Sequence, residues 1–188
     1  MLQPTYPLQT DRLLLRPYAD EDLDALHDLE RRAETARYLY NEPLTREGAV
    51  ALLERRRTMV AIDGASDDLA LVVALKGTGQ LIGHVMLKRT SRDHRQGEIG
   101  YVFHPDHHGR GYATEAAGLL MRLGFEELGL HRIVGRLDAR NAASAAVLER
   151  LGMRREANFR ENELVKGEWV DELVYAILAG DWRERQAT

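Results

Sequence analysis

Cysteine is absent from this 188-residue sequence. That absence excludes disulfide bonds, thiolate metal sites and a cysteine nucleophile, so any thioester chemistry must pass an acyl group directly from a cofactor to an acceptor. The sequence also lacks an apolar run as long as a membrane-spanning helix, and residues 1–7 lack the basic start and apolar core of a signal peptide. We therefore expect a cytoplasmic protein with no membrane partner.

An excess of positive charge is missing as well. Lys and Arg total 26 against 30 Asp and Glu, which leaves a formal net charge of -4 at pH 7. This balance argues against a nucleic-acid or anionic-membrane partner, and no patch interleaves aromatic with basic residues. A local basic patch would still be enough to hold a phosphorylated cofactor.

Repeats, low-complexity runs and linkers are also absent, so the chain offers no place to divide it. A length of 188 residues with 44% hydrophobic composition suits one globular unit with a substantial core. We expect a single domain over residues 1–188.

Hydrophobic patterning predicts the secondary structure. Apolar and β-branched runs predict strands over residues 13–15, 69–75, 81–87, 98–103, 133–137 and 172–178, with one more near Met153. Four helices are expected, starting at Asp20, at Thr45, near Ala113 and after Asn141. Residues 90–96 and 158–169 are predicted to be loops, the first of them mobile. This order indicates an α/β or α+β fold with a mixed sheet.

The stretch over residues 98–117 organises the rest of the chain. It reads as a strand that ends at Pro105, a glycine turn over residues 108–111, and a helix. The first amides of a helix lack internal partners and carry the positive end of its dipole, so anions bind there. Gly109 and Gly111 remove side chains where a phosphate would approach, and Arg110 and Thr114 would add a charge and a hydroxyl. A diphosphate is the expected ligand.

Two familiar nucleotide motifs do not fit this turn. The Rossmann fingerprint requires a third glycine where Thr114 stands, and no Walker lysine follows Gly111. On the turn alone, a plain strand-to-helix connection remains an alternative. Three histidines nearby, His104, His107 and His108, suggest a metal site, but Pro105 and Gly109 break the helical geometry that would align them. We expect no metal.

Here the residues resemble a known family. His108-Gly-Arg-Gly-Tyr-Ala113 is similar to the acyl-CoA diphosphate loop of the GCN5-related N-acetyltransferases (GNAT), in the form Gln/Arg-x-x-Gly-x-Gly/Ala. Further blocks agree with the branch that acetylates ribosomal-protein N-termini, the RimJ/RimL type: Thr10-Asp-Arg-Leu-Leu-Leu-Arg-Pro17, Asn141 to Met153, Gly167-Glu-Trp-Val-Asp171 and Val174-Tyr175. The resemblance covers almost the whole chain, and these blocks occur in the family's order.

The resemblance implies a fold and an acetyl-CoA site. It implies a central, mostly antiparallel sheet of about six or seven strands, flanked by about four helices and splayed between the fourth and fifth strands. Acetyl-CoA would enter that gap. The cofactor-binding residues implied are the strand amide near Phe103, which would also polarise the thioester carbonyl, the pantetheine-side Asn141, and the loop His108, Gly109, Arg110, Gly111, Tyr112, Ala113 and Thr114. His108 departs from the family's glutamine or arginine, so phosphate affinity is expected to vary with pH.

Two residues are candidates for proton transfer. Glu98 lies on the strand that leads into the loop, where the family often has a catalytic glutamate, and it would act as the base directly or through a water. Its alternative is a strand-edge carboxylate paired with Lys88 or Arg89. Many relatives protonate the leaving thiolate with a tyrosine, but Leu148 stands at that position. Ser144, one helical turn earlier, is the substitute, unless its hydroxyl only satisfies a local amide.

The acceptor is an amine, and three residues are candidates to hold it. Tyr38, Tyr40 and Asn41 lie in a loop that would form one wall of the acceptor site or merely pack. The resemblance favours a protein N-terminus as acceptor. The acidic Glu161, Glu163 and Glu168 leave open a small amine such as an aminoglycoside, a polyamine or an amino acid, and Leu148 leaves open a non-catalytic acyl-CoA-binding module. Relatives are often homodimers, although no interface is apparent in the sequence.

Overall fold

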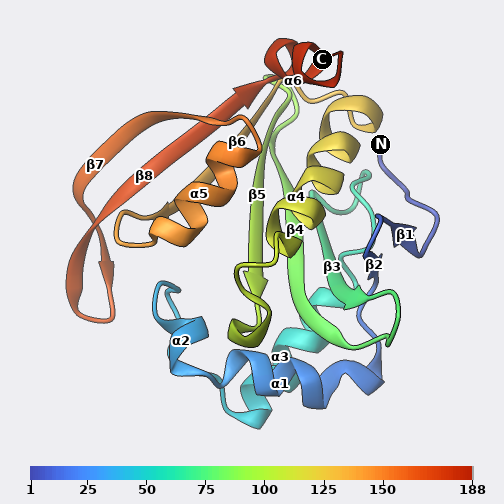
Figure 1. Ribbon diagram of the computed structural model, residues 1–188, viewed down its shortest axis with the longest axis vertical. Coiled ribbons are helices and arrows are strands. Elements are labelled where there is room, and N and C mark those ends of the chain that lie inside the picture. Colours follow the sequence, from blue (N-terminus) through green and yellow to red (C-terminus); the bar gives the residue numbers. More distant parts are fainter. Residues whose placement is uncertain (188) are drawn as a thin grey trace.

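The computed structural model describes residues 1–187, and within them eight strands form one mixed, mostly antiparallel sheet (Figure 1). The strand order is β1-β2-β3-β4-β5-β6-β8-β7, and only the pair β5–β6 is parallel. The bounds are β1 Leu8–Gln9, β2 Leu13–Arg16, β3 Asp68–Leu75, β4 Leu81–Ser91, β5 Gln96–Phe103, β6 Arg132–Asp138, β7 Arg154–Val165 and β8 Glu168–Leu178. The expected mixed α/β sheet is confirmed, with one more strand than predicted.

Helices cover both faces of this sheet. Leu69, Leu71 and Val73 of β3 share one core cluster with α4 and α5, whereas Ala70 and Val72 pack in a second cluster with α1 and α3. This alternation follows from the strand period of two residues, and it explains why β3 is apolar throughout. The helices are α1 Leu23–Glu30, α2 Ala33–Ala36, α3 Arg46–Arg56, α4 Tyr112–Arg122, α5 Ala142–Arg150 and α6 Ala179–Gln186.

Shorter helical turns lie at Asp20–Asp22, Pro105–His107 and Leu123–Glu127. The predicted cap at Asp20 is wrong, because Ala19 precedes the first turn and its amide donates to the carboxylate of Asp22. The caps predicted at Thr45 and Asn141 are confirmed: their side chains accept from the amides of Gly48 and Ser144. Within residues 1–187, no helix is long and apolar enough to cross a membrane.

The sheet splays between β5 and β6. These strands pair only where residues 96–98 lie beside residues 132–134, and they diverge beyond Glu98. The amide of His104 donates to the carbonyl of Ile82 on β4, so by alternation the amide of Phe103 points away from β4, toward the open edge. β5 and β6 correspond to the fourth and fifth predicted strands, so the splay lies where the family resemblance implied.

The loop predicted over residues 90–96 is confirmed but shorter than predicted, and the loop predicted over residues 158–169 is wrong. β4 and β5 extend through residues 90, 91 and 96, which leaves only a short turn with Arg95 at φ 49°. Residues 158–169 lie almost entirely in the hairpin of β7 and β8, which turns at Lys166 and Gly167, both with positive φ. Most of β7 is exposed, so its sequence has no apolar alternation, and it becomes a strand by pairing its backbone with β8.

This hairpin reaches across to the loop after α2, below it in Figure 1. The Lys166 ammonium donates to the carbonyl of Ala36 at 2.6 Å, and the Tyr40 hydroxyl donates to the carboxylate of Glu163. These two contacts join segments that are more than a hundred residues apart in the sequence. They bound the open edge of β5 on the side of Glu98.

Candidate active site

The glycine turn before α4 has the geometry of an anion site. Gly109 and Gly111 have φ of 73° and 80°, and no heavy atom lies within 4 Å of a Cβ placed on Gly109. No side chain caps the N-terminus of α4, so its first amides lack partners from a cap. The Oγ1 atom of Thr114 is buried without a hydrogen-bond partner among the described residues. These features fit a diphosphate.

The side chains of the loop are mostly engaged elsewhere. Nε2 of His108 donates to the carbonyl of Phe103 at 2.8 Å, so this imidazole ties the loop to the end of β5. The Tyr112 ring lies beneath the guanidinium of Arg12, and Ala113 packs against the core. Arg110 is exposed. The loop therefore presents backbone amides to a ligand, with Thr114 and Arg110 as the side chains best placed to add contacts.

An ion pair from the start of the chain supports this turn. Glu115 of α4 accepts from the hydroxyl of Thr10 at 2.6 Å and from the amide of Arg12 at 2.9 Å. The Arg12 guanidinium meets the same carboxylate at 2.6 Å, and its Nη1 donates to the carbonyl of Arg110 at 2.9 Å. Burial would raise the pKa of Glu115, but the hydrogen bonds from Thr10 and Arg12 outweigh it and hold the pKa below its ordinary value. Glu115 is therefore anionic at neutral pH.

Across the open edge of β5, Ser144 meets a residue that the sequence analysis missed. The Ser144 hydroxyl lies 2.9 Å from the phenol oxygen of Tyr101, which also donates to the Ser144 carbonyl at 3.1 Å. Burial raises the pKa of Tyr101 to about 12, so its phenol stays protonated at neutral pH. Leu148 is buried against Gly135 and fills a core position. The phenol comes from β5, and its only signal in the sequence was a tyrosine at a position that alternates with Ile99 and Phe103 on the buried face of the strand.

Glu98 lies on the other face of the sheet. Since successive strand residues point to opposite faces, Glu98 and Val102 face away from Tyr101 and Phe103. The Glu98 carboxylate lies 3.6 Å from Nε of Arg136. Nη1 of the same guanidinium lies 3.2 Å from the carboxylate of the buried Glu172. Burial raises the pKa of Glu98, and Arg136 and Lys88 only partly oppose this effect. A carboxylate with a raised pKa is a better proton acceptor than an ordinary exposed one.

The three residues predicted to bind the acceptor lie in three different environments. Tyr40 is exposed, and its hydroxyl contacts Glu163 on the hairpin; burial and the neighbouring carboxylate raise the pKa of Tyr40. Tyr38 is half-buried beneath the guanidinium of Arg37, 5.2 Å from the ring centre, so it packs on its own loop. Asn41 lines a cavity of about 400 Å³ between α3, its preceding loop, β4 and β5. We call this space the α3 cavity.

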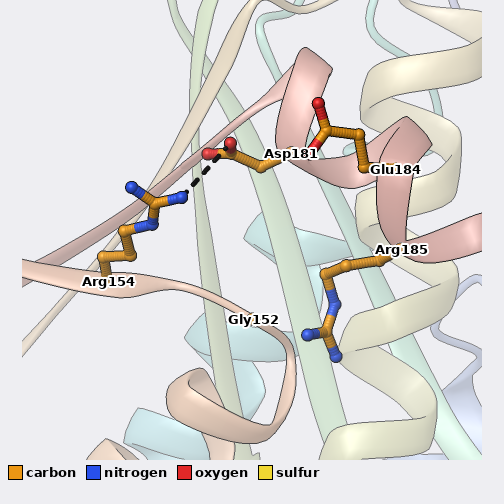
Figure 2. A pocket seen from close by; sticks show the side chains of 5 residues that line it. All are labelled: Gly152, Arg154, Asp181, Glu184 and Arg185. Carbon is orange, nitrogen blue, oxygen red and sulfur yellow. Dashed lines mark ion pairs between the residues drawn. The ribbon is translucent and has the colours of Figure 1, made fainter.

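Another pocket, of about 320 Å³, lies where β7 begins beside α6 (Figure 2). Arg154 extends toward Asp181, with 3.5 Å between their charged atoms, and Arg185 lies beside Gly152. This pocket is at the opposite end of the sheet from α2 (Figure 1). It contains charges of both signs and none of the predicted site residues.

The three loop histidines do not converge. His104 lies 3.1 Å from the carboxylate of Asp28, His108 binds the Phe103 carbonyl, and His107 lies between the rings of His104 and Tyr112. Within residues 1–187, no three metal-ligating side chains gather as a metal ion would require. Hydrogen bonds orient the rings of His104 and His108, whereas Nδ1 of His107 is buried without a hydrogen-bond partner among the described residues.

Comparison with known proteins decides the family. The model of the acetyltransferase (GNAT) domain matches residues 12–154. The chain belongs to the GNAT acetyltransferase family. It is 33% identical over 175 residues to the uncharacterized N-acetyltransferase YnaD of Bacillus subtilis (strain 168), covering 93% of this chain and 98% of that protein. It is 29% identical over 165 residues to the spermidine N(1)-acetyltransferase of Escherichia coli (strain K12), covering 82% and 80%.

A solved GNAT structure agrees with the fold. The GNAT-family acetyltransferase from Bacillus anthracis matches with a TM-score of 0.81 and 30% identity, over 96% of this chain and 99% of that one. This GNAT chain is therefore an acyltransferase enzyme of the N-acetyltransferase type, and GNAT enzymes use acetyl-CoA as their donor. The matches do not single out the RimJ/RimL branch.

Proposed function

We propose that this GNAT enzyme transfers an acetyl group from acetyl-CoA to a primary amine by direct attack. One observation carries the proposal: the edge of β5 beyond Glu98 is open, with the uncapped N-terminus of α4 at its end and Glu98 and Ser144 on its two faces. When bound, acetyl-CoA supplies a thioester whose carbonyl carbon an amine can attack. The remaining steps depend on residues of this chain.

Binding would use the backbone of the loop and of β5. The amides of the turn from Gly109 to Thr114 would hold the diphosphate, while the free edge of β5 would pair with the amide groups of pantetheine as a further strand does. The amide of Phe103 points into this gap, where it would donate to the thioester oxygen and stabilise the charge that develops there. Asn141 caps α5, so its part in pantetheine binding is indirect: it holds the amide of Ser144 in place.

Proton transfer would occur from the two faces of the gap. Glu98 would take the proton that the amine loses as its nitrogen bonds to the carbonyl carbon. When the carbon–sulfur bond breaks, the Ser144 hydroxyl, hydrogen-bonded to Tyr101, would supply a proton to the thiolate. The Tyr101 phenol stays protonated at neutral pH, so this hydroxyl pair has a proton to give.

The first candidate acceptor is the N-terminal amine of a protein. The loop after α2 and the β7–β8 hairpin contact each other through Lys166 and Tyr40, and the acceptor would bind beside them on the face of Glu98. An extended chain end would enter by that approach. We also expect a cytoplasmic homodimer, in which the exposed Leu164 and Trp169 of the hairpin are the apolar surface to cover.

A second candidate acceptor is a small cationic amine. The carboxylates of Glu163 and Glu172 help to raise the pKa of Glu98, and all three carboxylates raise that of Tyr40, so this region has a negative potential that Arg136 only partly offsets. A polyamine would be attracted to such a site. The similarity to a spermidine N(1)-acetyltransferase supports this candidate about as well as the loop arrangement supports the first.

Calorimetric titration with acetyl-CoA, followed by a free-thiol assay, tests both candidates. The assay should include N-terminal peptides, spermidine and aminoglycosides, each at a saturating acetyl-CoA concentration. We expect binding and acceptor-dependent thiol release, and the acceptor with the highest kcat/KM identifies the class. Binding without release from any amine would favour a non-catalytic acyl-CoA-binding module, and no binding would overturn the proposed function.

A further inference from the structure

The α3 cavity has the size and position of a second part of the acceptor site. Its volume of about 400 Å³ lies within the range of small-molecule sites. Leu39, Leu44, Leu52 and Val102 give it apolar walls, and the small side chain of Ala51 leaves it open along α3. An empty, partly apolar space of this kind can hold a side chain or a short carbon chain.

Its floor is a buried polar network. Nε2 of His84 lies 2.6 Å from the carboxylate of Glu30, and Nδ1 lies 2.6 Å from Nη1 of Arg56. A guanidinium can only donate, so Nδ1 accepts and the imidazole proton is on Nε2, which donates to Glu30. Arg56 also donates to the hydroxyl of Tyr18 at 2.9 Å. Glu30 and His84 are only 3% exposed, so the network is a rigid floor.

The charges around the cavity sum to a positive value. Burial and Arg56 lower the pKa of His84 to about 4, so this imidazole is neutral at pH 7. Burial would raise the pKa of Glu30, but the hydrogen bond from His84 and the charge of Arg56 lower it and keep the carboxylate ionised. Glu30 and Arg56 therefore offset each other. Arg55, at the exposed rim, forms no ion pair with another described residue and adds an uncompensated positive charge.

The cavity lies on the same face of β5 as the proposed base Glu98. Val102 lines it and lies on the same face of β5 as Glu98, four positions along the strand, which corresponds to roughly 13 Å. Gly100 lies between them, and the nearest atom to a Cβ there, on Met86, would be 3.9 Å away. No side chain on β5 therefore separates Glu98 from the cavity.

We propose that the α3 cavity binds the substituent of the acceptor amine, and that this substituent is an apolar stem ending in an acidic group, which pairs with Arg55. The inference rests on the proposed function, and it narrows the acceptor class. In a peptide acceptor the substituent would be the side chain of the first residue, and in a small acceptor it would be the carboxyl end of an ω-amino acid. A polyamine would instead bring an ammonium group toward Arg55, which costs electrostatic energy.

The test compares acceptors that differ only in charge. One pair is an ω-amino carboxylic acid and the α,ω-diamine with the same number of carbons; the other is a set of tripeptides that begin with Glu, Gln or Lys. We expect kcat/KM to favour the acidic member by about tenfold, the effect of roughly 1.4 kcal/mol. If only the tripeptides are acetylated, the acceptor is a peptide; if only the amino acid or the diamine is acetylated, the acceptor is a small molecule. A preference for the diamine and the Lys peptide would overturn the inference.

Two substitutions and one control locate the effect. Arg55→Glu should reverse the charge preference, and Ala51→Phe should fill the cavity and raise the KM of every acceptor with a long substituent. Arg57→Glu is the matched control, because Arg57 lies on the same helix end but pairs with Asp20 at 2.8 Å and does not line the cavity. Thermal melting and the acetyl-CoA Kd should be the same for all three variants.

The outcomes separate the inference from the proposed function. If wild-type protein acetylates amines but Arg55→Glu changes the charge preference no more than Arg57→Glu does, the cavity does not bind the acceptor and only the inference fails. If wild-type protein binds acetyl-CoA and acetylates none of these amines, the proposed function fails and the inference fails with it.

Discussion

At the scale of single residues, burial decides what each ionisable group can do. Glu98 and His84 lie on neighbouring strands, yet burial favours the neutral form of both, which raises the pKa of Glu98 and lowers that of His84. The first shift suits a proton acceptor, whereas the second keeps an internal imidazole uncharged. Both effects lead to measurable pH dependence.

Glu98→Gln should lower kcat by about 10²- to 10⁴-fold, the usual range for loss of a general base. The acetyl-CoA Kd should stay unchanged, because only the proton acceptor is removed. Wild-type kcat/KM should rise with pH through a pKa above that of an ordinary glutamate, and this step should vanish in the variant. Equal turnover of the two proteins across the pH range would reject Glu98 as the base.

His84 should make the free energy of unfolding depend on pH. Its pKa is about 4 in the folded protein and 6.5 ordinarily, so between these values the unfolded chain binds more protons. Stability is therefore complete above pH 6.5 and falls as pH drops toward 4, by at most about 3 kcal/mol. Denaturant unfolding at several pH values measures this slope. His84→Gln should give a shallower slope, and an unchanged slope would assign the effect to other groups.

At the scale of elements, the segment just before β2 stabilises the glycine turn before α4. Arg12 reaches from the start of β2 to the carbonyl of Arg110 and to Glu115 on α4, and its guanidinium also covers the Tyr112 ring. These contacts fix the turn from outside, which leaves its amides free to face a ligand. The two segments that resemble the family, residues 10–17 and residues 108–113, are therefore in direct contact in the structure.

Arg12→Ala should raise the Kd of acetyl-CoA by about tenfold, because the turn loses a bidentate, charge-assisted contact of roughly 1.5 kcal/mol. Phosphopantetheine, which lacks the diphosphate, should bind both proteins equally. Arg154→Ala is a suitable control, since Arg154 is an exposed arginine paired with Asp181 on α6 and has no contact with the turn. Isothermal titration measures all the values. Equal loss of affinity for both ligands would show that Arg12 acts on the fold in general.

At the scale of the whole molecule, distant segments close around the acceptor side. The hairpin of β7 and β8 meets the loop after α2 through Lys166 and through the Tyr40–Glu163 hydrogen bond. The carbonyl that accepts from Lys166 belongs to the buried Ala36, whereas Tyr40 is exposed. In the proposed function, these two segments border the side from which the acceptor binds.

Tyr40→Phe should raise the KM of the amine acceptor a few-fold and leave the acetyl-CoA Kd unchanged, because it removes only the hydroxyl that bonds Glu163. Tyr38→Phe provides the control: the same loop loses a hydroxyl, but from a ring that packs beneath Arg37. Steady-state kinetics with the best acceptor from the thiol assay compares them. Equal kinetics of both variants would exclude a role for the hairpin contact in acceptor binding.

Local pattern was sufficient for most of the fold. The apolar runs of β3 and β4, the helix starts at Thr45 and Asn141 and the glycine turn depend on residues close together in the chain, so they could be predicted from sequence. The exception was β7, whose side chains are exposed on both faces and carry no alternation. β7 is a strand because its backbone pairs with β8, and this pairing depends on tertiary structure rather than on the side chains of β7.

The sequence by itself determined the family, the mixed sheet and the glycine turn before a helix, because these follow from periodicity, turn chemistry and short ordered motifs. Tertiary structure alone decided that Tyr101 meets Ser144, 43 positions away, that Glu98 faces the opposite side of the gap, and that Arg56 binds His84. Each of these depends on which face of a strand a residue occupies and on which helix packs against that face. A one-residue change of register would reverse the face of every side chain, so the site exists only in the assembled sheet.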